Sequence, residues 1–375
     1  MKSPTFKSLS VPVHRASTLL FDSAETFLQR KANLFDGYSY GLYGTPTTRT
    51  LEQRVAEIEG GTRSVVVPSG LASITHALLA LLKSGDHILV ADCVYGPTRD
   101  FVLTVLARLG IEASFIPADA ACVADQLRPN TRLIVLESPG YYSMEIQDIA
   151  PICREAHAAG CLVLLDNAWG FGISSMFAHG IDIVSTPLSK YASGHSDVCM
   201  GAITTRDEAL FRQIKTFTAG IGTGVSADDA YLVLRGLESL QVRLAEHARR
   251  GLIVSDWLAK QPQVAQVLNP ALPGDVQHER FGKYFSSGNG LVSVLLRDRG
   301  LPQISPMLDG YEHFRIGGSY GGTHSLVAVA DLRHSRNLSP IPGNGLVVRY
   351  HIGLEPMDML LDDLGEGFNR LSSHS

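Results

Sequence analysis

Short apolar runs alternate with amphipathic stretches along most of the chain after about residue 50. Two clear runs lie at residues 133–136 and 161–165, and each is bounded by polar or glycine-containing segments. The stretches between such runs, for example residues 70–82 and 149–159, carry apolar residues at helical spacing. Strands that are apolar on both faces and separated by helices are typical of a mostly parallel sheet that helices cover. The pattern therefore predicts an α/β fold.

The same criteria place the individual elements. They predict strands over residues 64–67, 87–90, 133–136, 161–165, 181–185, 200–204, 291–295 and 346–350. They predict helices over residues 51–59, 70–82, 98–108, 149–159, 227–258 and 357–371, with Ser69 as the N-cap of the second helix.

The elements group into three regions. Residues 1–45 form an arm, rich in glycine and tyrosine over 36–44, that we expect to pack on the rest of the chain or on a neighbouring subunit. Residues 46–240 form a large domain with the mostly parallel sheet. Residues 241–375 form a smaller α+β domain, and the long helix over 227–258 bridges the two.

Composition narrows the function classes. The 375 residues are 45% hydrophobic and 18% charged with a net charge of −5, as in an ordinary globular protein. No basic stripe indicates nucleic acid, and no apolar stretch is long enough to cross a membrane. The first residues lack the apolar core of a signal peptide, and the five scattered cysteines form no CxxC pair, so we expect reduced thiols in the cytoplasm. No His/Cys cluster has metal-ligand spacing, and a catalytic cysteine remains a minor alternative.

An acid and a lysine follow two consecutive apolar strands. Asp166 directly follows the run at 161–165, and Lys190 comes five residues after the run at 181–185. Ligands of such sheets bind beyond the carboxyl ends of the strands, where Asp166 is expected. A pyridoxal phosphate (PLP) enzyme requires this pair: the lysine amine forms a Schiff base with the cofactor aldehyde, and the acid keeps the pyridinium nitrogen protonated.

Several further stretches extend this interpretation, in one order and with consistent spacing. They are residues 40–45 (YGLYGT), 136–140 (LESPG), 166–169 (DNAW), 189–197 (SKYASGHSD), 269–274 (NPALPG) and 349–355 (RYHIGLE). With them, the chain from about residue 33 to its end resembles the Cys/Met-metabolism family of PLP enzymes. The resemblance implies fold type I, the aspartate aminotransferase-type fold of PLP-dependent transferases.

The resemblance also implies cofactor-binding residues. Lys190 corresponds to the Schiff-base lysine, which also moves protons between substrate carbon atoms, and Asp166 to the pyridinium partner. Tyr95 corresponds to the tyrosine that stacks on the PLP ring. The phosphate is expected to bind the backbone N–H groups of Gly70 and Leu71 at a helix N-terminus, together with the hydroxyl of Ser189.

Four residues are implied at the substrate end. Arg349 corresponds to the arginine that binds the substrate α-carboxylate, a task that suits a bidentate guanidinium. Ser319 matches a backbone contact near that carboxylate, and Tyr320 follows it. Tyr40 corresponds to a residue that crosses a dimer interface to the neighbouring active site, where it approaches both the cofactor phosphate and the substrate end. The implied assembly is a homotetramer made of two such dimers.

Two positions depart from the family pattern. Leu42 stands where members normally carry an arginine that binds the partner's phosphate, and Pro187 stands where many relatives carry a second phosphate donor. Arg49 lies nearby in sequence and is a candidate replacement. Each lost bond to a charged group weakens binding by about 1.5–3 kcal/mol, so we expect the cofactor to dissociate more easily than in relatives.

The expected reaction is carbon–sulfur β-elimination from L-cystathionine or a related S-substituted cysteine, giving a thiol, pyruvate and ammonia. Gly318 replaces an acid that is frequent in γ-acting members, and Tyr320 and residues 137–140 also favour β-chemistry. γ-Elimination, γ-replacement and a specialised amino acid lyase are the alternatives. A non-catalytic PLP-binding protein is disfavoured by the presence of Lys190, Asp166 and Arg349. A Rossmann dehydrogenase is excluded, because no GxGxxG follows the first strand.

Overall fold

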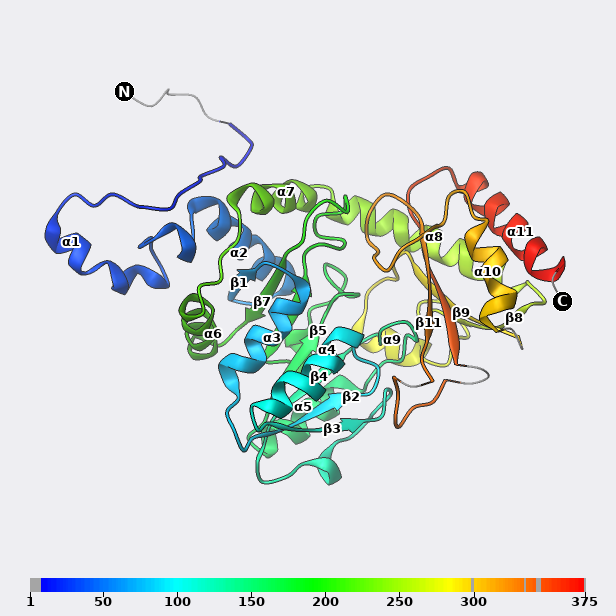
Figure 1. Cartoon of the computed structure of the whole chain (residues 1–375), viewed down its shortest axis with the longest axis horizontal. Helices are drawn as coiled ribbons and strands as arrows, with labels where there is room; N and C mark the ends of the chain where they lie inside the picture. The colour runs from blue at the N-terminus through cyan, green and yellow to red at the C-terminus, as the bar shows by residue number, and fades with distance from the viewer. Residues whose placement is uncertain (1–7, 298–299, 334, 342–344, 374–375) are drawn as a thin grey trace.

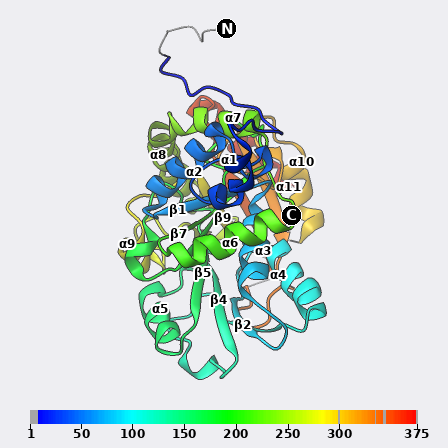
Figure 2. The ribbon, with the colours of Figure 1, turned by 90° about the vertical axis from the view of Figure 1, so that its left-hand side faces the viewer.

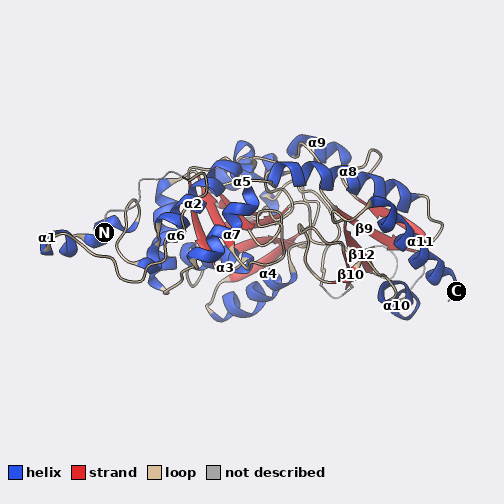
Figure 3. Cartoon of the chain, turned by 90° about the horizontal axis from the view of Figure 1, so that it is seen from above, coloured by secondary structure: helices blue, strands red, loops and turns tan. Residues whose placement is uncertain are grey.

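The computed structural model describes residues 8–297, 300–333, 335–341 and 345–373. Two sheets lie side by side, with the chain running from the N-terminal arm through the larger sheet to the smaller one (Figure 1). Viewed from above, the two sheets with their covering helices are separate along the long axis of the molecule (Figure 3). The α/β class expected from the apolar pattern is confirmed.

The larger sheet has seven strands in the order β1-β7-β6-β5-β4-β2-β3. Only the pairs made by β7 are antiparallel, so the sheet is mostly parallel. Figure 2 shows α5 on one face and α3 and α4 on the other. The strands are β1 (Arg63–Val67), β2 (His87–Ala91), β3 (Glu112–Ile116), β4 (Thr131–Glu137), β5 (Leu162–Asp166), β6 (Ile183–Pro187) and β7 (Gly201–Thr205).

Helices lie before, between and after these strands in the chain. They are α2 (Pro46–Glu59), α3 (Gly70–Leu81), α4 (Gly96–Phe101) continued by a π-helical turn (Val102–Leu106), α5 (Ile149–Ala158), α6 (Glu208–Gly220) and α7 (Ala227–Leu237). Short 3₁₀ segments lie at Ala124–Gln126 and Met176–His179. Because Ser69 accepts the N–H of Ala72 at 3.0 Å, the expected N-cap of α3 is confirmed.

The smaller sheet has the order β10-β11-β12-β9-β8. Its strands are β8 (Val264–Leu268), β9 (Leu291–Leu296), β10 (Arg315–Ile316), β11 (Leu326–Asp331) and β12 (Leu346–His351). The accompanying helices are α8 (Leu240–Ala259), α9 (His278–Tyr284), α10 (Leu301–Asp309) and α11 (Met357–Ser373). A second apolar core, which includes Val254, Phe314, Val348 and Leu364, joins this sheet to its helices.

The long helix expected over 227–258 is two helices, which is a correction to the sequence interpretation. α7 ends at Leu237, Ser239 precedes α8, and α8 starts at Leu240. A Cβ on Gly236 would lie 2.3 Å from the carbonyl oxygen of Ser193, so this turn of α7 packs directly against backbone. The apolar spacing continues across the break, which is why the pattern alone predicts one helix.

The arm extends away from the larger sheet (Figure 1). It contains α1 (Ala24–Leu28) and short 3₁₀ turns at Arg30–Leu34 and Gly41–Tyr43. Leu20 and Leu28 are 95% and 76% exposed in the single chain. Within the described ranges, no helix combines the length and the apolar character that crossing a membrane requires.

Candidate active site

Lys190 lies in the turn that follows β6 and lines a cavity that is partly open to solvent. Its Nζ donates to Ser319 Oγ at 2.8 Å and lies 4.9 Å from the centre of the Tyr320 ring. Burial, with the nearby charge of Arg349, lowers the pKa of Lys190 to about 8. A substantial fraction of this amine is therefore neutral near physiological pH, as a nucleophile must be.

Asp166 ends β5 in register with Glu137, the last residue of β4. Asp166 Oδ1 accepts the N–H of Ala168 at 3.0 Å, and burial raises the pKa of Asp166 to about 7. Glu137 accepts the N–H of Tyr95 at 2.6 Å, and burial raises the pKa of Glu137 well above its ordinary value. The cavity thus has two adjacent carboxyl groups whose ionisation requires a cationic partner.

A third buried carboxyl lies behind them. Glu59, at the end of α2, accepts Asn167 Nδ2 at 2.8 Å and the hydroxyl of Thr186. Burial is the main reason that the pKa of Glu59 rises to about 7. Through Asn167 and Thr186, Glu59 joins the residue after Asp166 to strand β6, which leads to Lys190.

The N-terminus of α3 also lines the cavity. Ser69, Gly70 and Leu71 line it together with Pro187 and Ser189. A Cβ on Gly70 would lie 2.5 Å from the Cβ of Pro187, so only glycine allows this close approach. The first N–H groups of a helix are an anion site, and a phosphate suits them.

Arg349 on β12 is 2% exposed, and its Nη2 donates to the carbonyl of Gly318 at 3.1 Å. Its guanidinium carbon lies 4.3 Å from the ring centre of Tyr142, 5.2 Å from that of Tyr141 and 5.3 Å from that of Tyr320. Among the described residues, no carboxylate forms an ion pair with it. A buried cation held only by aromatic rings and one carbonyl is suited to an anionic ligand.

One cavity brings most of the expected residues together. It is lined by Lys190, Asp166, Tyr95, Gly70, Leu71, Ser189 and Tyr320. Ser319 is not among the lining residues but accepts a hydrogen bond from Lys190. Arg349 is not among them either, but it contacts the lining residues Tyr320 and Gly318. Its volume is about 220 Å³, and it is partly open to solvent. The amine, the buried acid and the helix N-terminus fit the aldehyde, ring nitrogen and phosphate of PLP.

The remaining expected residues lie outside this cavity. Tyr40 contacts Ser17 and Tyr43 within the arm. Arg49 donates to Glu52 at 2.9 Å and to the carbonyl of Leu34 at 2.8 Å. Leu42 packs against Gly224. Their expected roles across a subunit interface therefore stay predictions.

Two ionisable residues that line the cavity were absent from the expected site residues. Glu137 carries the signal that identified Asp166, since it also closes an all-apolar strand. Tyr141 lines the cavity because of the loop conformation that follows β4, for which the sequence gives no pattern. Within the described ranges, no group of three or more His, Cys, Asp or Glu is arranged to hold a metal ion.

Comparison with known proteins gives consistent matches. The model of the family described as Cys/Met metabolism PLP-dependent enzyme matches residues 1–369. The chain is 35% identical to cystathionine beta-lyase MetC of Escherichia coli, covering 99% of this chain and 96% of that protein. It is 39% identical to a cystathionine beta-lyase of Bordetella avium, covering 96% and 92%.

Two other matches show the range of the relatives. An L-alanine/L-glutamate racemase of Wolbachia pipientis is 33% identical, covering 97% of this chain and 93% of that protein. The crystal structure of metB from Corynebacterium glutamicum superposes with a TM-score of 0.89 at 27% identity, covering 98% and 95% of the two chains.

Proposed function

Because the chain belongs to the Cys/Met-metabolism family of PLP-dependent enzymes, we propose that it cleaves the β-carbon–sulfur bond of L-cystathionine or a related S-substituted cysteine. With water, the products are a thiol (homocysteine from cystathionine), pyruvate and ammonia. The observation that carries the proposal is one cavity that holds Lys190 and Asp166 and has at its edge Arg349, which forms no ion pair with a carboxylate among the described residues.

The described residues divide the work. When bound, PLP would supply the electron sink, which accepts the electron pair that stays on the α-carbon when the α-proton is removed. In this proposal Asp166 would hold the ring nitrogen in its protonated form, and Arg349 would orient the substrate carboxylate. The amine of Lys190, with its pKa lowered to about 8, takes the α-proton and delivers a proton to the departing sulfur. Ser319 holds that amine at 2.8 Å.

The first experiment is product analysis with the PLP-loaded protein and L-cystathionine. Pyruvate with homocysteine is expected, and a Lys190→Ala variant is expected to release neither. 2-Oxobutyrate with cysteine would instead assign γ-elimination, and would contradict the weight given to Gly318 and Tyr320.

Amino acid racemisation is a second candidate, supported by the racemase relative at 33% identity. Racemisation needs proton removal and return at the α-carbon but no leaving group, and Lys190 serves that exchange as well. Incubation with L-alanine tests it: formation of D-alanine supports racemisation, and retention of pure L-alanine excludes it under the conditions used.

We further propose a cytoplasmic homotetramer built from dimers that share active sites. The support is the arm, whose exposed Leu20 and Leu28 need a covering surface, and five cysteines that are all free, as in a reducing compartment. Mixing inactive Lys190→Ala and Tyr40→Phe subunits tests site sharing. Recovered activity in the hybrids supports a Tyr40 that acts in the neighbouring site, and no recovery contradicts it.

A further inference from the structure

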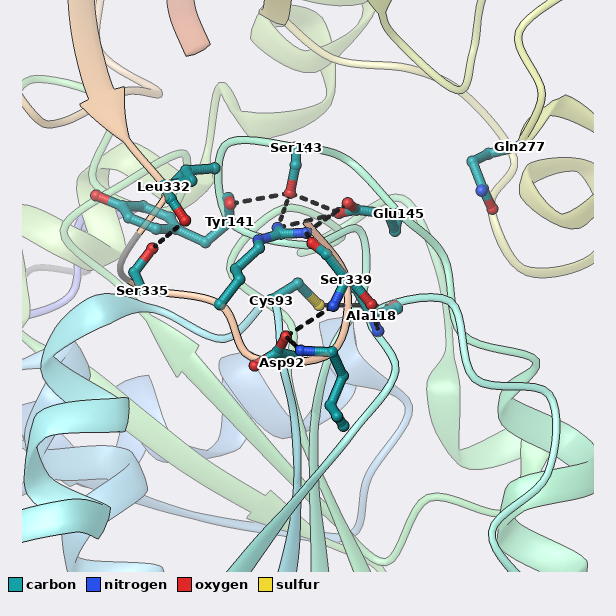
Figure 4. A network of polar contacts seen from close by, with 12 residues as sticks. Asp92, Cys93, Ala118, Tyr141, Ser143, Glu145, Gln277, Leu332, Ser335 and Ser339 are labelled. Carbon is teal, nitrogen blue, oxygen red and sulfur yellow. Dashed lines mark hydrogen bonds and ion pairs between the residues drawn. The ribbon is translucent and has the colours of Figure 1, made fainter. Parts of the chain in front are cut away.

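The connection between β11 and β12 reaches from the smaller sheet onto the larger one through Arg336. Arg336 Nη1 lies 2.6 Å from Glu145 Oε1, and its side chain is only 2% exposed. Its other terminal nitrogen donates to the hydroxyl of Ser143, which itself donates to Glu145 Oε2 at 2.5 Å. Figure 4 shows Ser143, Glu145 and the backbone of Tyr141 joined in this network.

The loop that Arg336 holds is strained. Tyr142 and Met144 have φ angles of 68° and 64°, which side-chain-bearing residues rarely adopt. Such a conformation persists only where surrounding contacts enforce it. Arg336 contacts Ser143 and Glu145, and these two residues alternate along the loop with the strained residues Tyr142 and Met144.

The other side of this loop forms the carboxylate end of the active site. Tyr141 lines the cavity, and the rings of Tyr141 and Tyr142 lie 5.2 Å and 4.3 Å from the guanidinium of Arg349. A change in the loop would therefore move the rings that hold Arg349. Arg336 itself does not line the cavity.

A second anchor keeps the connection docked without Arg336. The buried carboxylate of Asp92 accepts the N–H groups of Asn337, Leu338 and Ser339 at 2.9, 2.7 and 3.1 Å. Removing the Arg336 side chain should consequently free the 141–145 loop while the two sheets stay in contact. The effect should be local to the substrate site.

We propose that Arg336 is a positioning residue for substrate specificity. By binding Ser143 and Glu145, it keeps Tyr141 and Tyr142 in contact with Arg349. The position of Arg349, and with it the binding site of the substrate carboxylate, is thereby fixed. This inference rests on the proposed function, in which Arg349 binds that carboxylate. Arg336 acts on binding of the carboxylate and leaves the chemistry at Lys190 unchanged.

The test compares Arg336→Met, Arg336→Lys and the control Arg333→Met in the PLP-loaded enzyme. Arg333 lies on the same connection and pairs with Asp331 at an exposed site. Arg336→Met is expected to raise KM for L-cystathionine about tenfold or more with kcat changed less than about threefold, the pattern of lost uniform binding. Arg336→Lys should give an intermediate KM, and Arg333→Met none of these changes. A lower melting temperature with unchanged KM would overturn the proposal.

A spectral titration separates this proposal from the proposed function. L-Alanine and ethylamine differ by the carboxylate alone. Binding of each ligand to wild type and variant is measured by the change in cofactor absorbance. Arg336→Met should weaken L-alanine about tenfold or more and leave ethylamine unchanged, since only the carboxylate meets Arg349. Equal loss for both ligands would overturn the positioning role. Failure of wild type to release pyruvate would refute the proposed function alone. If Arg336→Met does not fold, Glu145→Gln replaces it in both measurements, with the same outcomes.

Discussion

Replacement of Arg349 tests the substrate end of the site most directly. One N–H of its guanidinium is engaged by the carbonyl of Gly318 at 3.1 Å, and three tyrosine rings hold its plane. The rest of the planar fork is free for two parallel bonds to a carboxylate, each with a contribution of about 1.5–3 kcal/mol. Arg349→Lys keeps one of these bonds, and Arg349→Met keeps neither.

The expected loss in kcat/KM follows from these energies. At about 1.4 kcal/mol per factor of ten, Arg349→Lys should lose about 10- to 150-fold, and Arg349→Met about 10²- to 10⁴-fold. Most of the loss should be in KM, because the carboxylate is held alike before and during bond cleavage. Steady-state pyruvate release gives both constants, and the cofactor absorbance checks that PLP stays bound. An Arg349→Met variant with wild-type KM would refute the assignment of Arg349 to the carboxylate.

Four further predictions concern the cofactor end of the site. Asp166→Asn removes the charge that opposes the ring nitrogen and should lower kcat by about 10- to 150-fold, the value of one charge-assisted bond, while PLP stays attached in the absorbance spectrum. The rate at which apo-protein takes up PLP should rise with pH to a midpoint near 8, because the reactive form of Lys190 is the neutral amine; a midpoint near 10.5 in stopped-flow absorbance would contradict the lowered pKa. Arg349→Met should shift that midpoint upward, since the arginine charge contributes to the lowering. Leu42→Arg should lower the PLP dissociation constant about tenfold or more by adding one bond to the phosphate; equilibrium dialysis that shows no change would speak against the missing-donor explanation.

The strands were predictable where the sequence is continuously apolar. β4 and β5 are buried on both faces, so their residues show the burial directly. β3 was missed because it lies at the sheet edge and its residues are mostly half-exposed, from Glu112 to Phe115. The antiparallel direction of β7 could not be predicted from its sequence either, because strand direction depends on the connection and not on the strand's own residues.

In the candidate site, too, some residues were predictable from local sequence and others were not. Asp166 ends β5 and Lys190 lies in the turn after β6, so their place at the sheet edge follows from the local pattern. The surroundings of Arg349 depend on Tyr141 and Tyr142. Tyr142 contacts Arg349 although the two residues are 207 positions apart in the sequence. Contacts of that kind require the folded loop, with its left-handed residues, and no local signal specifies them.

The three buried carboxyls have a consequence for the proton balance of the protein. Glu59 and Asp166, with pKa values of about 7 in the folded chain and ordinary values of 4.5 and 3.8, bind protons more tightly folded than unfolded. Their contribution to the stability of the cofactor-free protein is therefore present at low pH and is lost as pH rises through about 7. A cationic ring nitrogen reverses this preference for Asp166, because it stabilises the ionised carboxylate. Bound PLP would therefore reduce the part of this pH dependence that comes from Asp166, while the part from Glu59 would remain.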